Sequence, residues 1–122
     1  MIELIVAARC TGCNVCVKVC PTDVFDVSDN GPPRIARPSA CQTCFMCELY
    51  CDADALYVGP DCAASGAVEE QALLAQGALG RYRRDSGWGA WSSDPDHSNE
   101  HWRMELVFAL ARALDSADTP PR

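Results

Sequence analysis

The sequence predicts an α+β domain of short strands and short helices, followed by a helical and irregular extension. Two observations support this prediction. Residues 10–29 recur as residues 41–60, with four cysteines aligned in each copy. Near Gly59–Pro60 the repeat ends, and the chain becomes richer in Gly, Arg and Trp. We therefore expect a domain at residues 1–61, the cysteine half, and an appended segment at residues 62–122, the extension. A chain of 122 residues leaves no room for a second full domain.

Apolar stretches on either side of each cysteine group predict the strands. Val24–Val27 and Ala55–Val58 follow the two groups and are rich in strand-forming residues. Ile2–Ala7 and Arg34–Ala36 precede the groups and are expected to be partner strands. Asn30–Pro33 predicts a turn between the copies. The expected order, found twice, is strand, cysteine loop, short helix, strand.

The extension predicts three further elements. Ala67–Gln76 favours a helix, with acidic residues in its first turn and a glycine directly after it. Arg81–Asp96 is rich in Gly, Ser, Asp and Pro but carries three aromatic residues, so we expect an irregular segment that is ordered by contact. Asn99–Leu114 has apolar residues at spacings of three and four, which predicts an amphipathic helix. Asp115–Arg122 is expected to fray.

Charge and hydropathy disfavour several classes of function. The formal net charge of −7 disfavours nucleic-acid binding, because phosphate recognition needs a basic face. No apolar run approaches the roughly 18 residues that cross a bilayer, so we expect no membrane span. The first residues have no basic region before their short apolar stretch, unlike a secretory signal. We therefore expect a cytoplasmic protein.

The cysteine spacing predicts the chemistry. Each group reads C-x2-C-x2-C-x3-C, and the first runs on into Pro21, a pattern typical of 4Fe–4S ligation. Three cysteines at this spacing can turn their thiolates toward three corners of one cluster, while the fourth thiolate must come from elsewhere. Zinc is the weaker alternative, since zinc sites usually pair two C-x2-C units across a longer spacer. A purely structural cluster is a second alternative. Cys62 lies outside both groups and is expected to be a spare buried thiol.

Residues 1–61 resemble the bacterial-type two-cluster ferredoxins through the segments CTGCNVCVKVCP and CQTCFMCELYC. This resemblance implies a ferredoxin-like βαββαβ fold with two 4Fe–4S clusters, in which the fourth cysteine of each group binds the other group's cluster. The implied ligands are Cys10, Cys13, Cys16 and Cys51 for cluster I, and Cys41, Cys44, Cys47 and Cys20 for cluster II. Asp52 stands where the family commonly has a second proline, and its carboxylate is expected to lower the reduction potential of cluster I.

The order of parts also resembles the small iron–sulfur subunits that pair with a fumarate reductase or succinate dehydrogenase-type flavoprotein, as in the adenylylsulfate reductase beta subunit. This resemblance implies an electron-transfer subunit of a hetero-oligomer with a larger FAD-binding subunit. The chain has no nucleotide fingerprint, no P-loop and no nucleophile with a recognisable base, so catalysis would belong to the partner. The alternatives are a free-standing soluble ferredoxin and a redox-sensing interaction module.

Arginine and aromatic side chains in the extension predict a docking segment, because Arg, Tyr and Trp are enriched at interface hot spots. The alternative is that this segment folds back on the cysteine half, where its aromatics would cover the clusters and its arginines would neutralise acidic side chains. The terminal helix fits either role. His97 and His101 are expected at a helix start or on the surface, with no metal. The predicted docking residues are Arg81, Tyr82, Arg83, Arg84, Trp88, Trp91 and Trp102.

Overall fold

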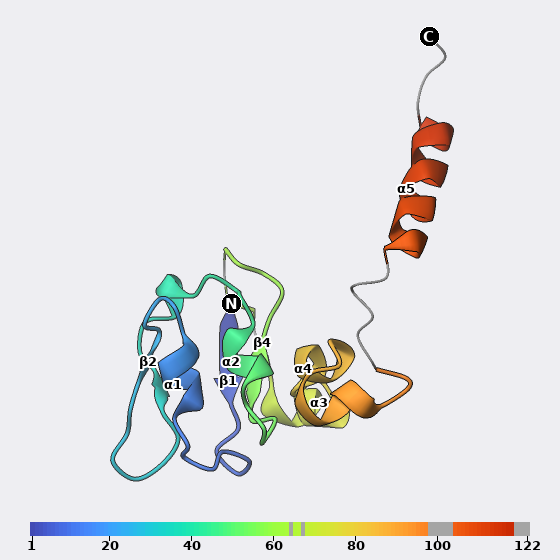
Figure 1. Ribbon diagram of the computed structural model, residues 1–122. Coiled ribbons are helices and arrows are strands. Elements are labelled where there is room, and N and C mark those ends of the chain that lie inside the picture. Colours follow the sequence, from blue (N-terminus) through green and yellow to red (C-terminus); the bar gives the residue numbers. More distant parts are fainter. Residues whose placement is uncertain (64, 67, 98–103, 119–122) are drawn as a thin grey trace.

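The structure is a computed structural model that describes residues 1–63, 65–66, 68–97 and 104–118. Its cysteine half alternates strands and helices (Figure 1). The order is β1 (Ile2–Ile5), α1 (Val15–Val19), β2 (Phe25–Asp26), β3 (Arg34–Ile35), the 3₁₀ turn η1 (Pro38–Ala40), α2 (Met46–Leu49) and β4 (Leu56–Val58). All four predicted strands are present, each shorter than predicted, and the α+β class is confirmed.

The strands pair across the two copies of the repeat. β1 runs antiparallel to β4, and β2 runs antiparallel to β3, in two separate two-stranded sheets. The same backbone bond closes each pair: Val6 N donates to Ala55 O at 2.7 Å, and Arg37 N donates to Val24 O at 2.9 Å. The strand before one cysteine group is thus bound to the strand after the other group.

The backbone of the cysteine loops repeats as closely as the sequence. A positive φ is uncommon outside glycine, so equivalent residues that share it indicate the same chain path. The positive-φ residues are Gly12, Asn14 and Asp23 in the first copy and Thr43, Phe45 and Asp54 in the second. These six positions correspond pairwise at the offset that relates Cys10 to Cys41. The sequence duplication is therefore also a duplication of structure.

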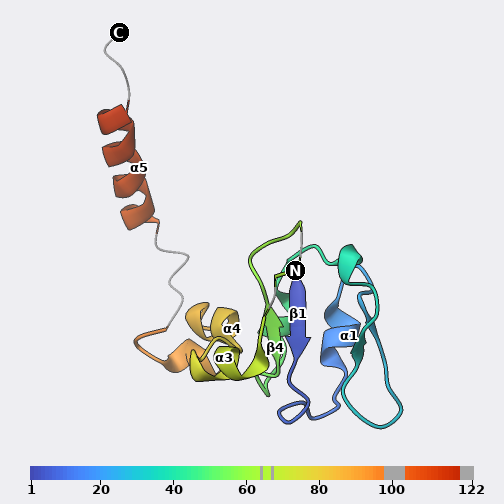
Figure 2. The same ribbon diagram turned by 180° about the vertical axis from the view of Figure 1, so that it is seen from behind.

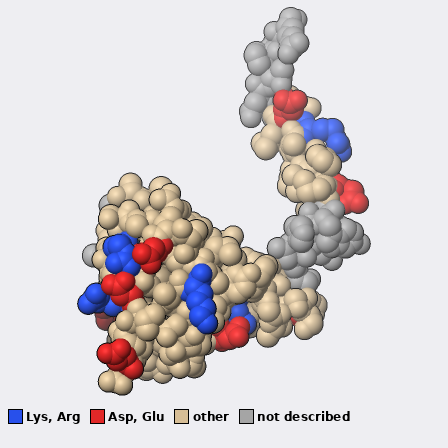
Figure 3. Space-filling model, turned by 60° about the vertical axis from the view of Figure 1, so that its left-hand side comes forward, with Lys and Arg blue, Asp and Glu red and all other residues tan. Residues whose placement is uncertain are grey.

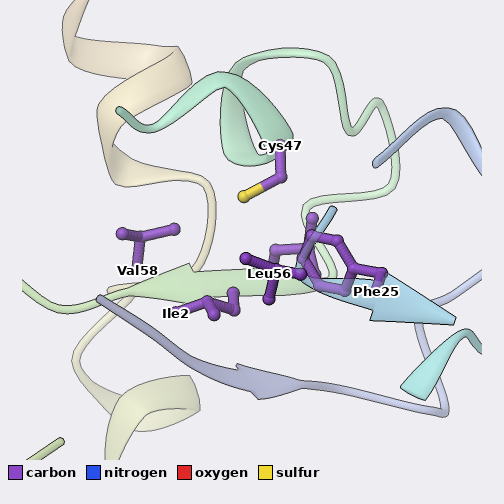
Figure 4. Packing of buried hydrophobic residues seen from close by; sticks show 6 residues of the cluster. Ile2, Phe25, Cys47, Leu56 and Val58 are labelled. Carbon is purple, nitrogen blue, oxygen red and sulfur yellow. The ribbon is translucent and has the colours of Figure 1, made fainter. Parts of the chain in front are cut away.

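A small apolar core lies between the sheets and the helices. Figure 4 shows side chains from β1, β2 and β4 that converge beneath α2. Leu56 and Val24 are the largest fully buried side chains, and α1 packs against α2. Strands of two to four residues and a core of this size contribute little stability by themselves. The core residues are Ile2, Val24, Phe25, Cys47, Leu56 and Val58.

The extension contains more helix than the sequence predicts. Its elements are α3 (Glu70–Ala75), α4 (Arg81–Asp85), the 3₁₀ turn η2 (Gly89–Ser93) and α5 (Glu105–Asp118). The helix predicted over Ala67–Gln76 is present but shorter, since Ala67 lies outside the described residues and α3 covers only Glu70–Ala75; Gly77 comes shortly after it with a φ of +64°. Arg81–Asp96 was expected to be irregular, and this was wrong: α4 and η2 lie within it. The sequence of these short elements shows no helical periodicity. They form because of contacts with the cysteine half and because of local turns.

The last helix ends later than predicted. Asp115–Asp118, which were expected to fray, belong to α5, and residues 99–103 of the predicted helix lie outside the described part of the chain. Figures 1 and 2 agree that α3 and α4 lie beside β4, whereas α5 stands away from the rest of the molecule. Among the described residues, no helix has both the length and the apolar run needed to cross a bilayer.

Candidate metal centres

Two cavities in the cysteine half are each lined by four cysteines. The first encloses about 350 Å³, including its open mouth, and the second about 310 Å³. Each takes three cysteines from one group and the fourth cysteine from the other group. The cysteines are Cys10, Cys13, Cys16 and Cys51 in the first cavity, and Cys20, Cys41, Cys44 and Cys47 in the second.

The remaining walls of both cavities are mainly apolar. Ile5 and Leu56 line the first cavity, while Ile2, Phe25 and Val58 line the second. Leu56, Ile2, Phe25 and Val58 also belong to the core shown in Figure 4. The cysteine thiols therefore face apolar walls that keep water away from one side of each cavity.

Backbone amides point at the cysteine sulfurs in a repeated pattern. The amide two residues after the first cysteine of each group donates to the sulfur of that first cysteine. The amide four residues after the last cysteine donates to the sulfur of that last cysteine. These N–H donors favour the thiolate form of the sulfur. The bonds are Gly12 N to Cys10 Sγ, Thr43 N to Cys41 Sγ, Val24 N to Cys20 Sγ and Ala55 N to Cys51 Sγ, each at 3.4 Å.

Burial acts against the thiolates deepest in the two cavities. It raises the pKa of Cys16 to about 11 and that of Cys47 to about 12, and it also raises the pKa of Cys51. For Cys20, burial also favours the thiol, but hydrogen bonds from the backbone and from Thr22 together outweigh it and lower the pKa. A buried thiolate is costly without a cation to compensate it, and a metal-bound thiol is deprotonated outright. The donor set therefore fits a metal group that carries positive charge into each cavity.

The sulfurs line each cavity and do not converge on a point. All nine cysteines are free of disulfides. In the described part of the chain, no three His, Cys, Asp or Glu side chains are grouped as the ligands of one metal ion would be. Four thiols spread around a cavity suit a group with several metal corners better than they suit a single ion.

Comparison with protein families agrees with this geometry. Residues 9–56 match the family model described as a 4Fe-4S dicluster domain. The match supports a ferredoxin-type iron–sulfur protein. It spans all eight cysteines that line the two cavities. No curated protein and no solved structure matched the chain. A ferredoxin-type domain carries electrons through iron–sulfur clusters.

The extension covers part of this iron–sulfur domain with aromatic rings. Tyr82 stacks on Phe45, which lies between the second and third cysteines of its group, with ring centroids 4.4 Å apart and planes inclined by 20°. Trp88 meets Tyr50 edge to face at 5.6 Å. Both rings of the extension are still about 42% exposed. These contacts agree with the alternative in which the extension folds back on the cysteine half. A docking role for the exposed faces of the two rings stays a prediction.

A buried carboxylate joins the extension to the domain, and sequence reasoning missed it. Glu48 of α2 is only 2% exposed. Its Oε2 accepts the Val58 amide of β4 at 3.2 Å, and its Oε1 accepts the Tyr82 amide of α4 at 2.9 Å. Burial raises the pKa of Glu48, while the two amides oppose that shift. Glu48 follows Cys47 directly, so the link begins at the wall of the second cavity.

The other predicted docking residues have different surroundings. Arg83 is buried against Asp52 and Asp54. Arg81 donates to the Gln76 carbonyl just after α3, and Arg84 pairs with its neighbour Asp85. The ring of Trp91 contacts His97 at 5.0 Å. Trp102 and His101 lie outside the described residues.

The ninth cysteine corrects one expectation. Cys62 was expected to be a spare buried thiol, but it is exposed and lines neither cavity. It follows the last strand by four residues, where the chain has already left the core.

Proposed function

We propose that the chain is an electron-transfer subunit that relays single electrons through two 4Fe–4S clusters. The observation that carries this proposal is the pair of cavities, each lined by three cysteines of one group and the fourth of the other. The order β1–α1–β2–β3–α2–β4 supports a ferredoxin-like βαββαβ topology. The proposed ligands are Cys10, Cys13, Cys16 and Cys51 for cluster I, and Cys41, Cys44, Cys47 and Cys20 for cluster II.

The chain's own residues would hold and insulate the clusters. The thiols bind the iron, the repeated backbone amides stabilise charge on the sulfurs, and the apolar walls exclude water. Cys16 of the first cavity lies in α1 and Cys47 of the second lies in α2, and these two helices pack against each other. Clusters of this type exchange single electrons. Adjacent cavities therefore support a relay through the domain.

We also propose that the partner is a larger FAD-binding oxidoreductase subunit. This chain would then correspond to the small iron–sulfur subunit, as the adenylylsulfate reductase beta subunit does. α5 supports this proposal, because it presents a large apolar surface and stands away from the rest of the chain (Figures 1 and 2). Leu106 is 70% exposed and Leu114 is 64% exposed. The face in Figure 3 mixes basic and acidic side chains and presents no extended surface of one sign. From the exposed apolar side chains of α5, we expect apolar contact to contribute more to docking than charge does. A cytoplasmic location stays a prediction.

A free-standing electron carrier is the second candidate, and one observation favours it. Tyr82, Arg83 and Trp88 contact the cysteine half of the same chain. In that case α3 and α4 would act as a cap, and the clusters would exchange electrons with transient partners.

An anaerobic pull-down with the cluster-loaded chain as bait separates the two candidates. We expect a flavin-bearing protein to co-elute, identified by its absorption spectrum, and we expect Leu110→Asp in α5 to abolish the capture. Lys18→Asp in α1 is the matched control and should still capture the partner. A brown monomer that captures no flavoprotein would support the free-standing carrier. A chain that binds no iron–sulfur cluster would contradict both.

A further inference from the structure

Arg83 is a charged side chain buried where the extension meets the cysteine half. It is only 7% exposed. Its Nη2 lies 3.3 Å from Asp52 Oδ1, and its Nη1 lies 3.6 Å from Asp54 Oδ1. Both carboxylates belong to the loop that directly follows Cys51, the fourth cysteine of the first cavity. The extension therefore brings a positive charge to the loop that carries the proposed fourth ligand of cluster I.

Two glycines make room for this group. Gly89 has a φ of +60°, and a Cβ there would lie 2.8 Å from Arg83 Nη2. Gly80 has a φ of +70°, and a Cβ there would collide with the Asp54 carboxylate. Larger residues at either position would displace the ion pair. The backbone of the extension is thus shaped around Arg83 and its partner.

The loops after the two fourth cysteines differ in charge. At the offset that relates the copies, Asp54 corresponds to Asp23, but Asp52 corresponds to Pro21. The loop after Cys51 therefore carries one more carboxylate than the loop after Cys20. Without a counter-charge, cluster I would be bound in the more negative surroundings.

The two loops also differ in how their counter-charges are exposed. In the first copy Asp23 pairs with Arg37 at 3.5 Å, and the Arg37 side chain is 42% exposed. The Arg83 side chain is 8% exposed, whereas its partner Asp52 is 93% exposed. Water and salt screen exposed charges more than buried ones. The field of Arg83 should therefore reach the first cavity with less screening than the field of Asp52 does, and with less screening than the field of Arg37 meets on its way to the second cavity.

We propose that Arg83 raises the reduction potential of cluster I and offsets the lowering expected from Asp52. The inference rests on the proposed ligation of cluster I by Cys51. Reduction adds one negative charge to a cluster, so a nearby positive charge stabilises the reduced form and a nearby carboxylate stabilises the oxidised form. Through Arg83, the folded extension would adjust the potential difference across which the relay runs.

A redox titration of the full chain, with both clusters loaded and followed by EPR, tests the inference. We expect Arg83→Gln to lower one of the two reduction waves by at least a threefold change in its equilibrium, about 28 mV for one electron. Arg83→Lys keeps the charge and should stay near the parent protein. Asp52→Asn should move the same wave upward. Arg37→Gln, the exposed counterpart, should shift either wave by less.

The titration can overturn the inference in two ways. The inference is refuted if both waves of the loaded Arg83→Gln protein stay unmoved, or if both move equally. If Arg83→Gln does not fold, Arg83→Met, which keeps most of the aliphatic stem and removes the charge, decides the question, and an unmoved pair of waves in its loaded form refutes the inference. Iron content and absorption, measured before the titration, keep the two proposals apart. A chain without two clusters contradicts the proposed function, whereas a loaded chain with unmoved waves contradicts only the role of Arg83.

Discussion

Cys20 and Cys51 are the residues on which the crossed arrangement depends. Each is the last cysteine of its own group in the sequence, yet each lines the cavity that holds the first three cysteines of the other group. Because β1 pairs with β4 and β2 with β3, the chain carries each fourth cysteine to the opposite cavity. The ligand set therefore depends on strand pairing, which brings together residues far apart in the sequence.

Paired cysteine variants test this arrangement. Cys51→Ala combined with Cys10→Ala should keep one cluster, because both residues line the first cavity. Cys51→Ala combined with Cys41→Ala should lose both, because those residues line different cavities. Iron content and the EPR spectrum of the reduced protein measure the outcome. Cys62→Ala is the control and should keep both clusters. The opposite pattern in the two double variants would show that each group binds its own cluster.

At this scale the sequence predicts the ligands but not their surroundings. The spacing of the cysteines is a local signal, and the structure places all eight around the two cavities. Glu48 could not be found in the same way, and for Arg83 the sequence indicates the residue but not its partners Asp52 and Asp54. Each has charged or polar partners more than ten residues away in the sequence, at Tyr82 for Glu48 and at Asp52 for Arg83. A buried charge is recognised only once the fold has brought its partners together.

Among the elements, α4 shows how tertiary contact can override local sequence. Its five residues would be too few for a stable isolated helix. Here Glu48 accepts one of its first amides, and Tyr82 stacks on Phe45. The repeated strands and cysteine loops, in contrast, were predictable, because both copies carry the same apolar and turn residues. Pairing between copies was not, because either partner strand satisfies the same local pattern.

The stack of Tyr82 on Phe45 predicts that the extension protects cluster II. Phe45 follows Cys44 directly, so removal of the covering ring should admit water and oxygen to the second cavity. An aromatic pair contributes about 0.5–1.5 kcal/mol beyond its burial, so Tyr82→Ala should speed cluster loss several-fold. The decay of iron–sulfur absorption in air measures the rate. Trp91→Ala is the matched control, since its ring contacts His97. Equal decay rates for parent and Tyr82→Ala would contradict the protective role.

For the whole molecule, the clusters are expected to stabilise the fold as well as carry electrons. The core is small, the strands have two to four residues, and no disulfide is present among the described residues. Small domains of this kind need a metal or covalent staple, and metal binding is then coupled to folding. The two cavities occupy the space where a larger domain would have apolar side chains.

Removal of iron should therefore unfold the cysteine half. After chelation under oxidising conditions, we expect loss of the near-ultraviolet circular dichroism and rapid proteolysis within residues 1–61. Reconstitution with iron and sulfide should restore both. An apoprotein that keeps its near-ultraviolet signal and its resistance to protease would show that the core folds without clusters.

The most direct test of the central claim is the iron content and EPR spectrum of the full chain after anaerobic reconstitution. We predict about eight irons per chain, since two clusters of four irons are expected, with two signals on reduction that broaden each other because the cavities are adjacent. About one or two irons per chain without such signals, or zinc in place of iron, would contradict the two-cluster account.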